Sequence, residues 1–139
     1  MTITVKGHPL EVAEAAAGVA RATFAQLCSR AYGAADYLSL AHTFHTVVID
    51  DVPVLDAARR NEAKRFIILI DTFYDNAVKL LASARAQPDE LYIATDGYEV
   101  NEFKRTASRL IEMRSQAYLG LPHGPRQGPG FDTKAIVET

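Results

Sequence analysis

Two neighbouring acids close an apolar run near the middle of the chain. Asp50 and Asp51 follow Val47, Val48 and Ile49, an arrangement typical of a buried strand that ends in carboxylates. In nucleotide hydrolases one such acid binds magnesium, and a second orients the water that attacks a phosphate. Asp50 and Asp51 are therefore candidate metal ligands. Acids after a buried strand also form turns and cap helices, so this second interpretation stays open.

A hydroxyl closes the next apolar run, Val78 to Ser83. Ring-forming nucleotide hydrolases keep at this place a polar residue that hydrogen-bonds the attacking water. Ser83 is therefore a candidate nucleotide-binding residue. The competing interpretation is a hydroxyl that satisfies backbone groups at the start of a loop.

Arg105 and Arg109 lie four residues apart. On a helix they would share one face, so the spacing predicts a basic helix face. An arginine donated across a subunit boundary can raise the rate of phosphoryl transfer by roughly 10³ to 10⁵. Both are therefore candidate nucleotide-sensing or finger arginines. The alternative pairs Arg105 with Glu102 and Arg109 with Glu112 as surface ion pairs.

Other reactive side chains are assigned to structure. His42 and His45 lack a third metal ligand nearby in the sequence. Asp71 and Asp75 would repel each other at helical spacing, so we expect them to face water. Cys28 has no cation close to it in the sequence and is predicted to be a small buried apolar residue.

Several motifs are absent from the sequence. It contains no Gly-x-x-x-x-Gly-Lys-[Ser/Thr] loop, no Gly-x-Ser-x-Gly elbow and no Gly-x-Gly-x-x-Gly loop. A phosphate cradle made of backbone amides and a lysine is therefore not encoded here. The residues predict part of a nucleotide-hydrolase sheet without its phosphate loop.

The elements that must position these side chains follow from hydrophobic periodicity. A β-branched strand at residues 46–50 ends before Pro53, and a second strand covers residues 78–83. Between them Asp56 can cap a long helix that stops at Asn76. Strand, helix and strand in this order predict a parallel βαβ unit with a right-handed crossover. The predicted apolar stripe of the helix is Ala63, Phe66, Ile67, Ile70, Phe73, Tyr74 and Ala77.

The fold class predicted is therefore α/β, with an N-terminal β-hairpin over residues 3–12 and a C-terminal helix. Four of the eight glycines and three of the six prolines fall within residues 120–139, which predicts a disordered tail after a domain at residues 1–119. The other predicted elements are a strand at 19–23, a short helix begun by a capping box at Thr23 to Gln26, a helix at 37–44 and an amphipathic helix at 103–118.

Composition limits the class of protein. The chain has 139 residues, of which 48% are hydrophobic, and its 15 basic and 17 acidic residues give a net charge of -2. This describes one ordinary domain without a global field that would attract nucleic acid. A single cysteine suits a reducing compartment, and no run of about 18 apolar residues predicts a membrane span.

A series of blocks covers residues 2–119: VARATFAQLC at 19–28, ADYLSLAHTFHTV at 35–47, DVPVL at 51–55, EAKRFI at 62–67, LID at 69–71, VKL at 78–80 and RTASRLIEM at 105–113. In order and spacing these blocks resemble the C-terminal portion of the ZapE (AFG-like) ATPases. The family consists of AAA-type P-loop ATPases, which act in bacterial cell division at the constriction ring and in mitochondrial inner-membrane protein quality control.

The resemblance implies that the Walker A loop, the main Walker B acids and the first sensor lie upstream of the matched region. It implies ATP and magnesium as cofactors of the full-length family and none for this chain alone. It also implies an upstream P-loop domain as partner, a homo-oligomer, and protein partners such as division-ring components, with no nucleic acid. The implied location is the cytoplasm, peripheral to the inner membrane, or the mitochondrial matrix in eukaryotic relatives.

The resemblance changes the weight of the candidate residues. Asp50 and Asp51 then correspond to a turn after a strand, which lowers the metal interpretation. Arg105 and Arg109 match the Arg-Thr-x-Ser-Arg-Leu block of the family. The chain departs from the family pattern at Asn101, Lys104 and Arg114, and these departures make the helix face more basic.

Two hypotheses on function follow. The first makes the chain the C-terminal part of an ATPase that remodels proteins and is inactive alone. The second makes it a free-standing interaction module without catalysis that binds a partner through its two long helices. An upstream, in-frame Gly-x-x-x-x-Gly-Lys-[Ser/Thr] would support the first, and a genuine start at Met1 the second.

Overall fold

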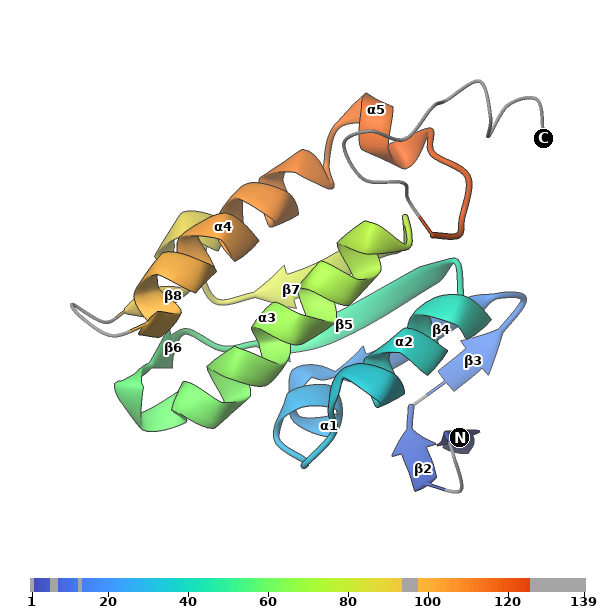
Figure 1. Ribbon diagram of the computed structural model, residues 1–139, viewed down its shortest axis with the longest axis horizontal. Coiled ribbons are helices and arrows are strands. Elements are labelled where there is room, and N and C mark those ends of the chain that lie inside the picture. Colours follow the sequence, from blue (N-terminus) through green and yellow to red (C-terminus); the bar gives the residue numbers. More distant parts are fainter. Residues whose placement is uncertain (1, 6–7, 13, 94–97, 126–139) are drawn as a thin grey trace.

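The computed structural model describes residues 2–5, 8–12, 14–93 and 98–125 (Figure 1). It has an α/β fold with a mixed sheet of mostly parallel strands, as predicted. The elements in chain order are β1 (Thr2–Val5), β2 (His8–Glu11), β3 (Glu14–Ala16), β4 (Val19–Thr23), α1 (Phe24–Cys28), α2 (Ala34–Thr43), β5 (Thr46–Val52), β6 (Leu55–Asp56), the 3-10 turn η1 (Ala57–Arg59), α3 (Arg60–Asp75), β7 (Lys79–Ala84), the 3-10 turn η2 (Pro88–Glu90), β8 (Tyr92–Ile93), α4 (Tyr98–Glu112) and α5 (Gln116–Leu119).

The main sheet has the strand order β3-β4-β5-β7. β3 and β4 are antiparallel, whereas β4, β5 and β7 are parallel, with Val47 paired to Ala20 on one side and to Leu80 on the other. The predicted βαβ unit is therefore confirmed as β5, α3 and β7. The predicted N-terminal hairpin is also present, since β1 and β2 pair in antiparallel register.

A tight turn joins β3 to β4 at Ala17 and Gly18, which both have positive φ angles, 53° and 80°. A Cβ atom on Gly18 would lie 2.5 Å from the ring of His45, so glycine is required there for space as well as for backbone angle. Alanine-rich segments have low β-propensity, which is why the sequence does not predict β3.

Local signals set the helix ends. The Thr23 hydroxyl accepts a hydrogen bond from the Gln26 amide at 3.0 Å, and the Gln26 side chain accepts one from the Thr23 amide at 2.9 Å. The predicted capping box is thus present. Asp56 caps the η1 turn, through the Ala58 amide at 3.0 Å, and α3 itself begins four residues later than Asp56. Asn76 is the C-cap of α3, as predicted.

One face of the sheet carries the core. Ala20 and Ala22 of β4 and Val47 and Ile49 of β5 are fully buried. Side chains alternate across a strand, and α1, α2 and α3 lie on this one side of the sheet (Figure 1). The predicted stripe is buried except for the half-buried Tyr74, but its last residue, Ala77, lies beyond the end of α3 at Asp75.

An aromatic cluster joins α3 to the flanking elements. The Phe66 ring lies 5.7 Å from Phe24 of α1 and 6.1 Å from Phe103 of α4, centroid to centroid. Phe103 in turn stacks on Tyr92 of β8 at 5.4 Å. Because Phe66 touches two helices across the core, it is the central side chain of this layer.

The C-terminal helix predicted at residues 103–118 is two helices in the structure. α4 starts earlier, at Tyr98, and ends at Glu112, and Ser115 then caps α5 by accepting a hydrogen bond from the Tyr118 amide at 3.1 Å. The Tyr118 hydroxyl donates a hydrogen bond to the Val78 carbonyl oxygen at 2.7 Å, and this bond joins α5 to the start of β7.

Part of the glycine- and proline-rich tail is described. The Gly124 amide donates to the Asn76 carbonyl at 3.0 Å, and a ring nitrogen of His123 lies 2.6 Å from the Ala41 carbonyl oxygen. Residues 126–139, which carry most of the disorder prediction, lie outside the described residues.

Candidate functional site

The carboxyl ends of β5 and β7 meet at a β-bulge. Ile49 pairs with Ala82 and Val52 with Ala84, so β5 has one residue more than β7 in this interval. Asp51 adopts the left-handed region at φ 64°, which costs an aspartate less than most other non-glycine residues. A bulge re-aims side chains at the edge of a sheet. Both acids predicted at this edge therefore sit on irregular backbone.

Ser83 holds this bulge together. Its hydroxyl oxygen accepts a hydrogen bond from the Asp51 amide at 2.9 Å. The structure thus brings Asp51 and Ser83 into direct contact from two parallel strands. This contact corresponds to the structural interpretation of the serine, and a nucleotide-binding role for Ser83 stays a prediction.

Asp50 points to the neighbouring strand. Its carboxylate lies 2.7 Å from Nε of Arg21 in β4, and this hydrogen bond raises the pKa of the Arg21 guanidinium. Within the described ranges no group of three or more His, Cys, Asp or Glu side chains is placed to hold a metal ion. The structure therefore gives Asp50 a cation partner from the protein itself.

An open cleft of about 520 Å³ lies beside the bulge. In open parallel sheets, ligands bind outside the carboxyl ends of the strands, which is where this cleft is found. The cleft offers both signs of charge to a ligand. Its lining residues are Asp51, Pro53, Val54, Asp56, Arg59 and Arg85.

Arg109 is held against α3. Its guanidinium forms an ion pair with Asp71 and lies 5.0 Å from the centre of the Tyr74 ring. The Tyr74 hydroxyl donates to the Glu112 carboxylate at 2.7 Å. Asp71, predicted to face water, therefore faces α4, and Glu112 is bound by Tyr74 where the sequence suggested Arg109. Both changes arise because α3 and α4 pack together along their lengths.

Arg105 has different surroundings, although it lies on the same helix. Its nearest carboxylate is Glu102, at 3.8 Å, and 56% of the Arg105 side chain is exposed, against 27% for Arg109. The Glu102 contact is the ion pair that the sequence offered as the alternative. At this distance and exposure such a pair contributes little to stability. The Arg105 guanidinium remains accessible at the surface.

Two charged residues not singled out in the sequence have central positions. Glu99, at 5% exposure, binds Arg60 of α3 at 3.0 Å and Lys64 at 3.6 Å, and so ties α4 to α3. Lys79 donates to the carbonyl oxygens of Tyr118 at 3.3 Å and Leu121 at 2.8 Å. No local signal could have revealed these roles, because the partners are far apart in the sequence.

Two further reactive side chains from the sequence analysis, Cys28 and His45, lie in structural surroundings. Cys28 is buried, and burial raises the pKa of its thiol to about 12, so the thiolate is scarce at neutral pH. The His45 ring lies 2.8 Å from the Thr46 hydroxyl and 3.2 Å from the Ala17 carbonyl oxygen. Cys28 and His45 therefore serve the fold.

These observations define an α/β domain of the class built on parallel βαβ units, with charged side chains at the carboxyl edge of its sheet. The chain belongs to the AFG1-like ATPase family, whose model matches residues 1–122. The family resemblance seen in the sequence is thereby confirmed.

Curated relatives agree with this assignment. The chain is similar to cell division protein ZapE of Escherichia coli K12, with 38% identity over 123 residues that cover 88% of the chain and 32% of the relative. It is also similar to lactation elevated protein 1 homolog B of Danio rerio, with 30% identity over 84% of the chain and 29% of the relative. The chain thus spans about a third of the length of the curated relatives it matches.

No solved structure matches the chain. In the part of the chain that the structure describes, none of the helices combines the length and the apolar character needed to cross a lipid bilayer.

Proposed function

We propose that this chain is the C-terminal part of an AAA-type ATPase that couples ATP hydrolysis to protein remodelling at the division site or the inner membrane. The observation that carries the proposal is the family match over residues 1–122 in a chain that spans only about a third of its relatives. A cell-division role follows from the similarity to cell division protein ZapE. In this proposal the P-loop domain that binds ATP and magnesium lies upstream.

The chain by itself neither binds ATP tightly nor hydrolyses it. Its sequence contains no Gly-x-x-x-x-Gly-Lys-[Ser/Thr] loop, and a few surface arginines cannot replace a cradle of backbone amides. Isothermal titration calorimetry of the chain with ATP in magnesium buffer tests this. We expect no saturable heat at micromolar nucleotide, and a micromolar dissociation constant would refute the proposal.

In this proposal the chain contributes to ATP turnover by supplying a cation that stabilises the charge on the transferring phosphoryl group. Arg105 is the better placed of the two predicted arginines, because its guanidinium is exposed and its contact to Glu102 is long. At a boundary with a neighbouring domain or subunit it could reach the phosphate charge. Arg109 acts as a positioning residue, since its bonds to Asp71 and Tyr74 fix α4 on α3.

The carboxyl edge of the sheet has a supporting role in the proposal. Asp50 and Asp51 remain candidate magnesium ligands, yet Asp50 already binds Arg21 and the amide of Asp51 is held by Ser83. These contacts favour a structural role for both acids, in which they maintain the shape of this edge of the sheet. Magnesium is then bound by the upstream domain.

The proposal places the full-length protein in the cytoplasm, peripheral to the inner membrane, as a homo-oligomer with protein partners such as division-ring components. A second candidate is a free-standing interaction module. The observation that favours it is an apolar groove beside β7, of about 590 Å³. A Gly-x-x-x-x-Gly-Lys-[Ser/Thr] motif encoded in frame upstream of Met1 would support the ATPase proposal over the interaction module.

A further inference from the structure

β7 forms one edge of the main sheet. The Lys79 amide donates to the His45 carbonyl at 2.9 Å, on the β5 side. Because backbone groups of a strand alternate in direction, the N–H and C=O groups of Leu80, Ala82 and Ala84 point away from β5. Among the described strands β7 pairs with β5 alone. Within the described ranges this outer row of donors and acceptors therefore has no strand beside it.

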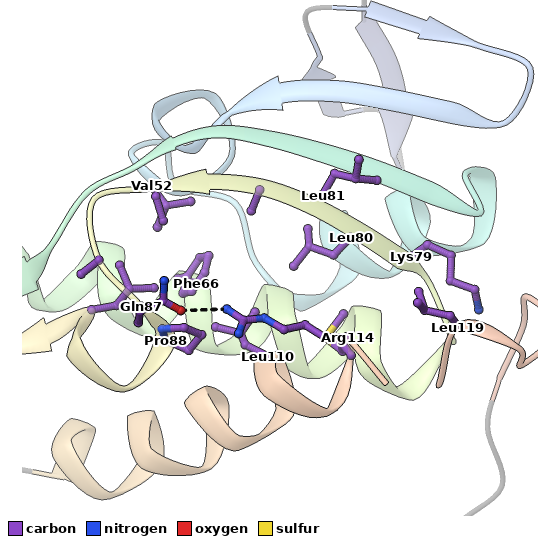
Figure 2. Close-up of a pocket in the computed structure, with 15 residues that line it drawn as sticks. Val52, Phe66, Lys79, Leu80, Leu81, Gln87, Pro88, Leu110, Arg114 and Leu119 are labelled. Atoms are coloured by element: carbon purple, nitrogen blue, oxygen red, sulfur yellow. Dashed lines mark hydrogen bonds between the residues drawn. The ribbon is translucent and has the colours of Figure 1, made fainter. Parts of the chain in front are cut away.

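A groove of about 590 Å³ runs along this edge, between β7 and the helices α4 and α5 (Figure 2). Leu80 points into the groove, whereas Leu81 points to the other side of the strand (Figure 2). Since side chains alternate along a strand, Ala82 and Ala84 lie on the groove side with Leu80, and both alanines are exposed. Their small side chains leave room beside β7 for larger apolar groups. The facing wall is apolar and includes Leu110, Met113 and Leu119.

The charges beside this groove are positive. Its described lining contains two cations, Lys79 and Arg114, and no carboxylate. The Lys79 ammonium already donates to three backbone carbonyl oxygens, so it is committed to the fold. The Arg114 guanidinium makes an exposed hydrogen bond of 3.3 Å to the side chain of Gln87, three residues after the end of β7 (Figure 2). An incoming carboxylate could therefore meet Arg114 without displacing a buried partner.

An extended peptide fits this edge better than a helix. A helix would fill the groove but leave the outer backbone groups of β7 unpaired and cut off from water, which is unfavourable. An added strand would pair with these groups, and its alternate side chains would enter the groove. The six residues of β7 offer about 20 Å of edge to such a strand.

The groove also selects the side chains of the peptide. Those that enter it should be apolar, because they would contact the apolar wall formed by α4 and α5. An acidic side chain at the end that lies beside Arg114 would complement the positive charge there, and such complementarity fixes the register of a bound segment. A basic segment would be disfavoured for the same reason.

We propose that the outer edge of β7 and this groove bind an extended segment of another protein, one with alternating apolar side chains and an acidic residue at Arg114. The inference rests on the second candidate function, the interaction module. It is independent of the ATPase proposal, since no residue of this site is assigned to nucleotide. Edge strands without such a partner are prone to pairing with other chains.

An NMR titration of the full chain with a designed peptide tests the proposal. The probe is acetyl-Glu-Thr-Val-Thr-Val-Thr-Glu-amide, which reads the same in both directions and has its valines and acids on one face of a strand. We expect saturable shifts of the outward amides of Leu80, Ala82 and Ala84. At about ten times the dissociation constant their hydrogens should exchange about 10-fold more slowly than without peptide. The inward amides of Leu81 and Ser83 should keep their exchange rates.

A proline variant tests the backbone pairing. Ala82→Pro removes one outward N–H and keeps the hydrogen bonds to β5, because proline is tolerated on an edge strand whose N–H faces solvent. It should weaken peptide binding by at least about 10-fold. Protected amides of Leu81 and Ser83 in this variant would show that the sheet is intact.

A second variant tests the charge. Arg114→Ala should weaken binding about 3- to 5-fold, and a peptide with lysine in place of both glutamates should bind more weakly than the acidic peptide. Arg30→Ala is the matched control. Arg30 is exposed between α1 and α2, so this variant removes the same charge outside the groove and should leave the dissociation constant unchanged.

Any of the following results would overturn the proposal. The shifts could fail to saturate with about 1 mM peptide. Binding could survive Ala82→Pro, or be as strong with the lysine peptide, which would mean apolar contact without strand pairing or charge recognition. Outward amides already protected without peptide would mean that another part of the chain covers the edge, or a second copy where protection rises with protein concentration. The titration contains no nucleotide, so its failure would leave the ATPase proposal standing.

Discussion

The α3–α4 interface and the carboxyl edge of the sheet both hold charged residues, in opposite surroundings. At the interface Arg109 is bound by Asp71 and lies over the Tyr74 ring between two packed helices. At the edge Asp51 lies on an irregular, exposed backbone beside an open cleft.

This difference shows how much the surroundings of a charged residue decide its use. A guanidinium fixed by a carboxylate and a ring between two helices is committed to packing, and removing it disturbs both helices. Charges around an open cleft keep most of their contact with water and remain available to a ligand. Arg105 lies on α4, but its side chain is exposed like the charged side chains at the carboxyl edge of the sheet. For this reason Arg105 is the candidate for nucleotide contact.

The largest effect is expected from the apolar part of the interface. Phe66→Ala should lower the free energy of unfolding by about 2 to 5 kcal/mol, because it opens a cavity between α1, α3 and α4. Ile68→Ala is the control on the same helix, since Ile68 is 38% exposed, and should cost under about 1 kcal/mol. Urea unfolding of both variants measures this. Equal losses would mean that the packing of α3 is misassigned.

A smaller effect is expected from the charged part of the interface. Arg109→Ala should cost about 1 to 2 kcal/mol, through loss of the ion pair and of the ring contact. Arg105→Ala should change stability by at most about 0.5 kcal/mol. A double-mutant cycle with Asp71→Ala checks the pair directly, because neighbours in contact give a coupling energy. A cycle without coupling would contradict the described contact.

The smallest effect is expected at the carboxyl edge. Ser83→Ala removes the acceptor of the Asp51 amide and should cost about 0.5 to 1 kcal/mol, since water can replace an exposed partner. Ser83→Thr keeps the hydroxyl and is the conservative control. Urea unfolding measures the free energy of unfolding of the two variants. Equal losses for Ser83→Thr and Ser83→Ala would contradict the assignment of the Ser83 hydroxyl as the acceptor of the Asp51 amide.

Local and periodic features of this fold can be predicted from the sequence. The stripe of α3 and the β-branched run of β5 define the βαβ unit, because each has a clear period. The capping box at Thr23 is a signal contained within four residues. The break between α4 and α5 is less visible, since the Ser115 cap interrupts a helix whose apolar period continues.

The candidate site depends more on contacts between distant residues. Arg109 and Asp71 are 38 positions apart, and Glu99 meets Arg60 from another helix. Such pairs follow from how the helices pack, which single-sequence periodicity does not determine. The extra residue in β5 at Asp51 likewise depends on its register with β7. Sequence spacing could therefore identify both Arg105 and Arg109 as candidates. Only the fold shows that Arg109 is packed against α3 whereas Arg105 is exposed.

The most direct test of the account is the ATPase turnover of the full-length protein with Arg105→Ala. We predict a fall in kcat of at least about 10³-fold with unchanged folding and assembly, and little rescue by Arg105→Lys, which lacks the planar fork. Arg109→Ala, assayed where it is fully folded, should keep most of its turnover. If Arg105→Ala keeps most of its turnover, the account is contradicted and the basic face of α4 should be assigned to packing or partner binding.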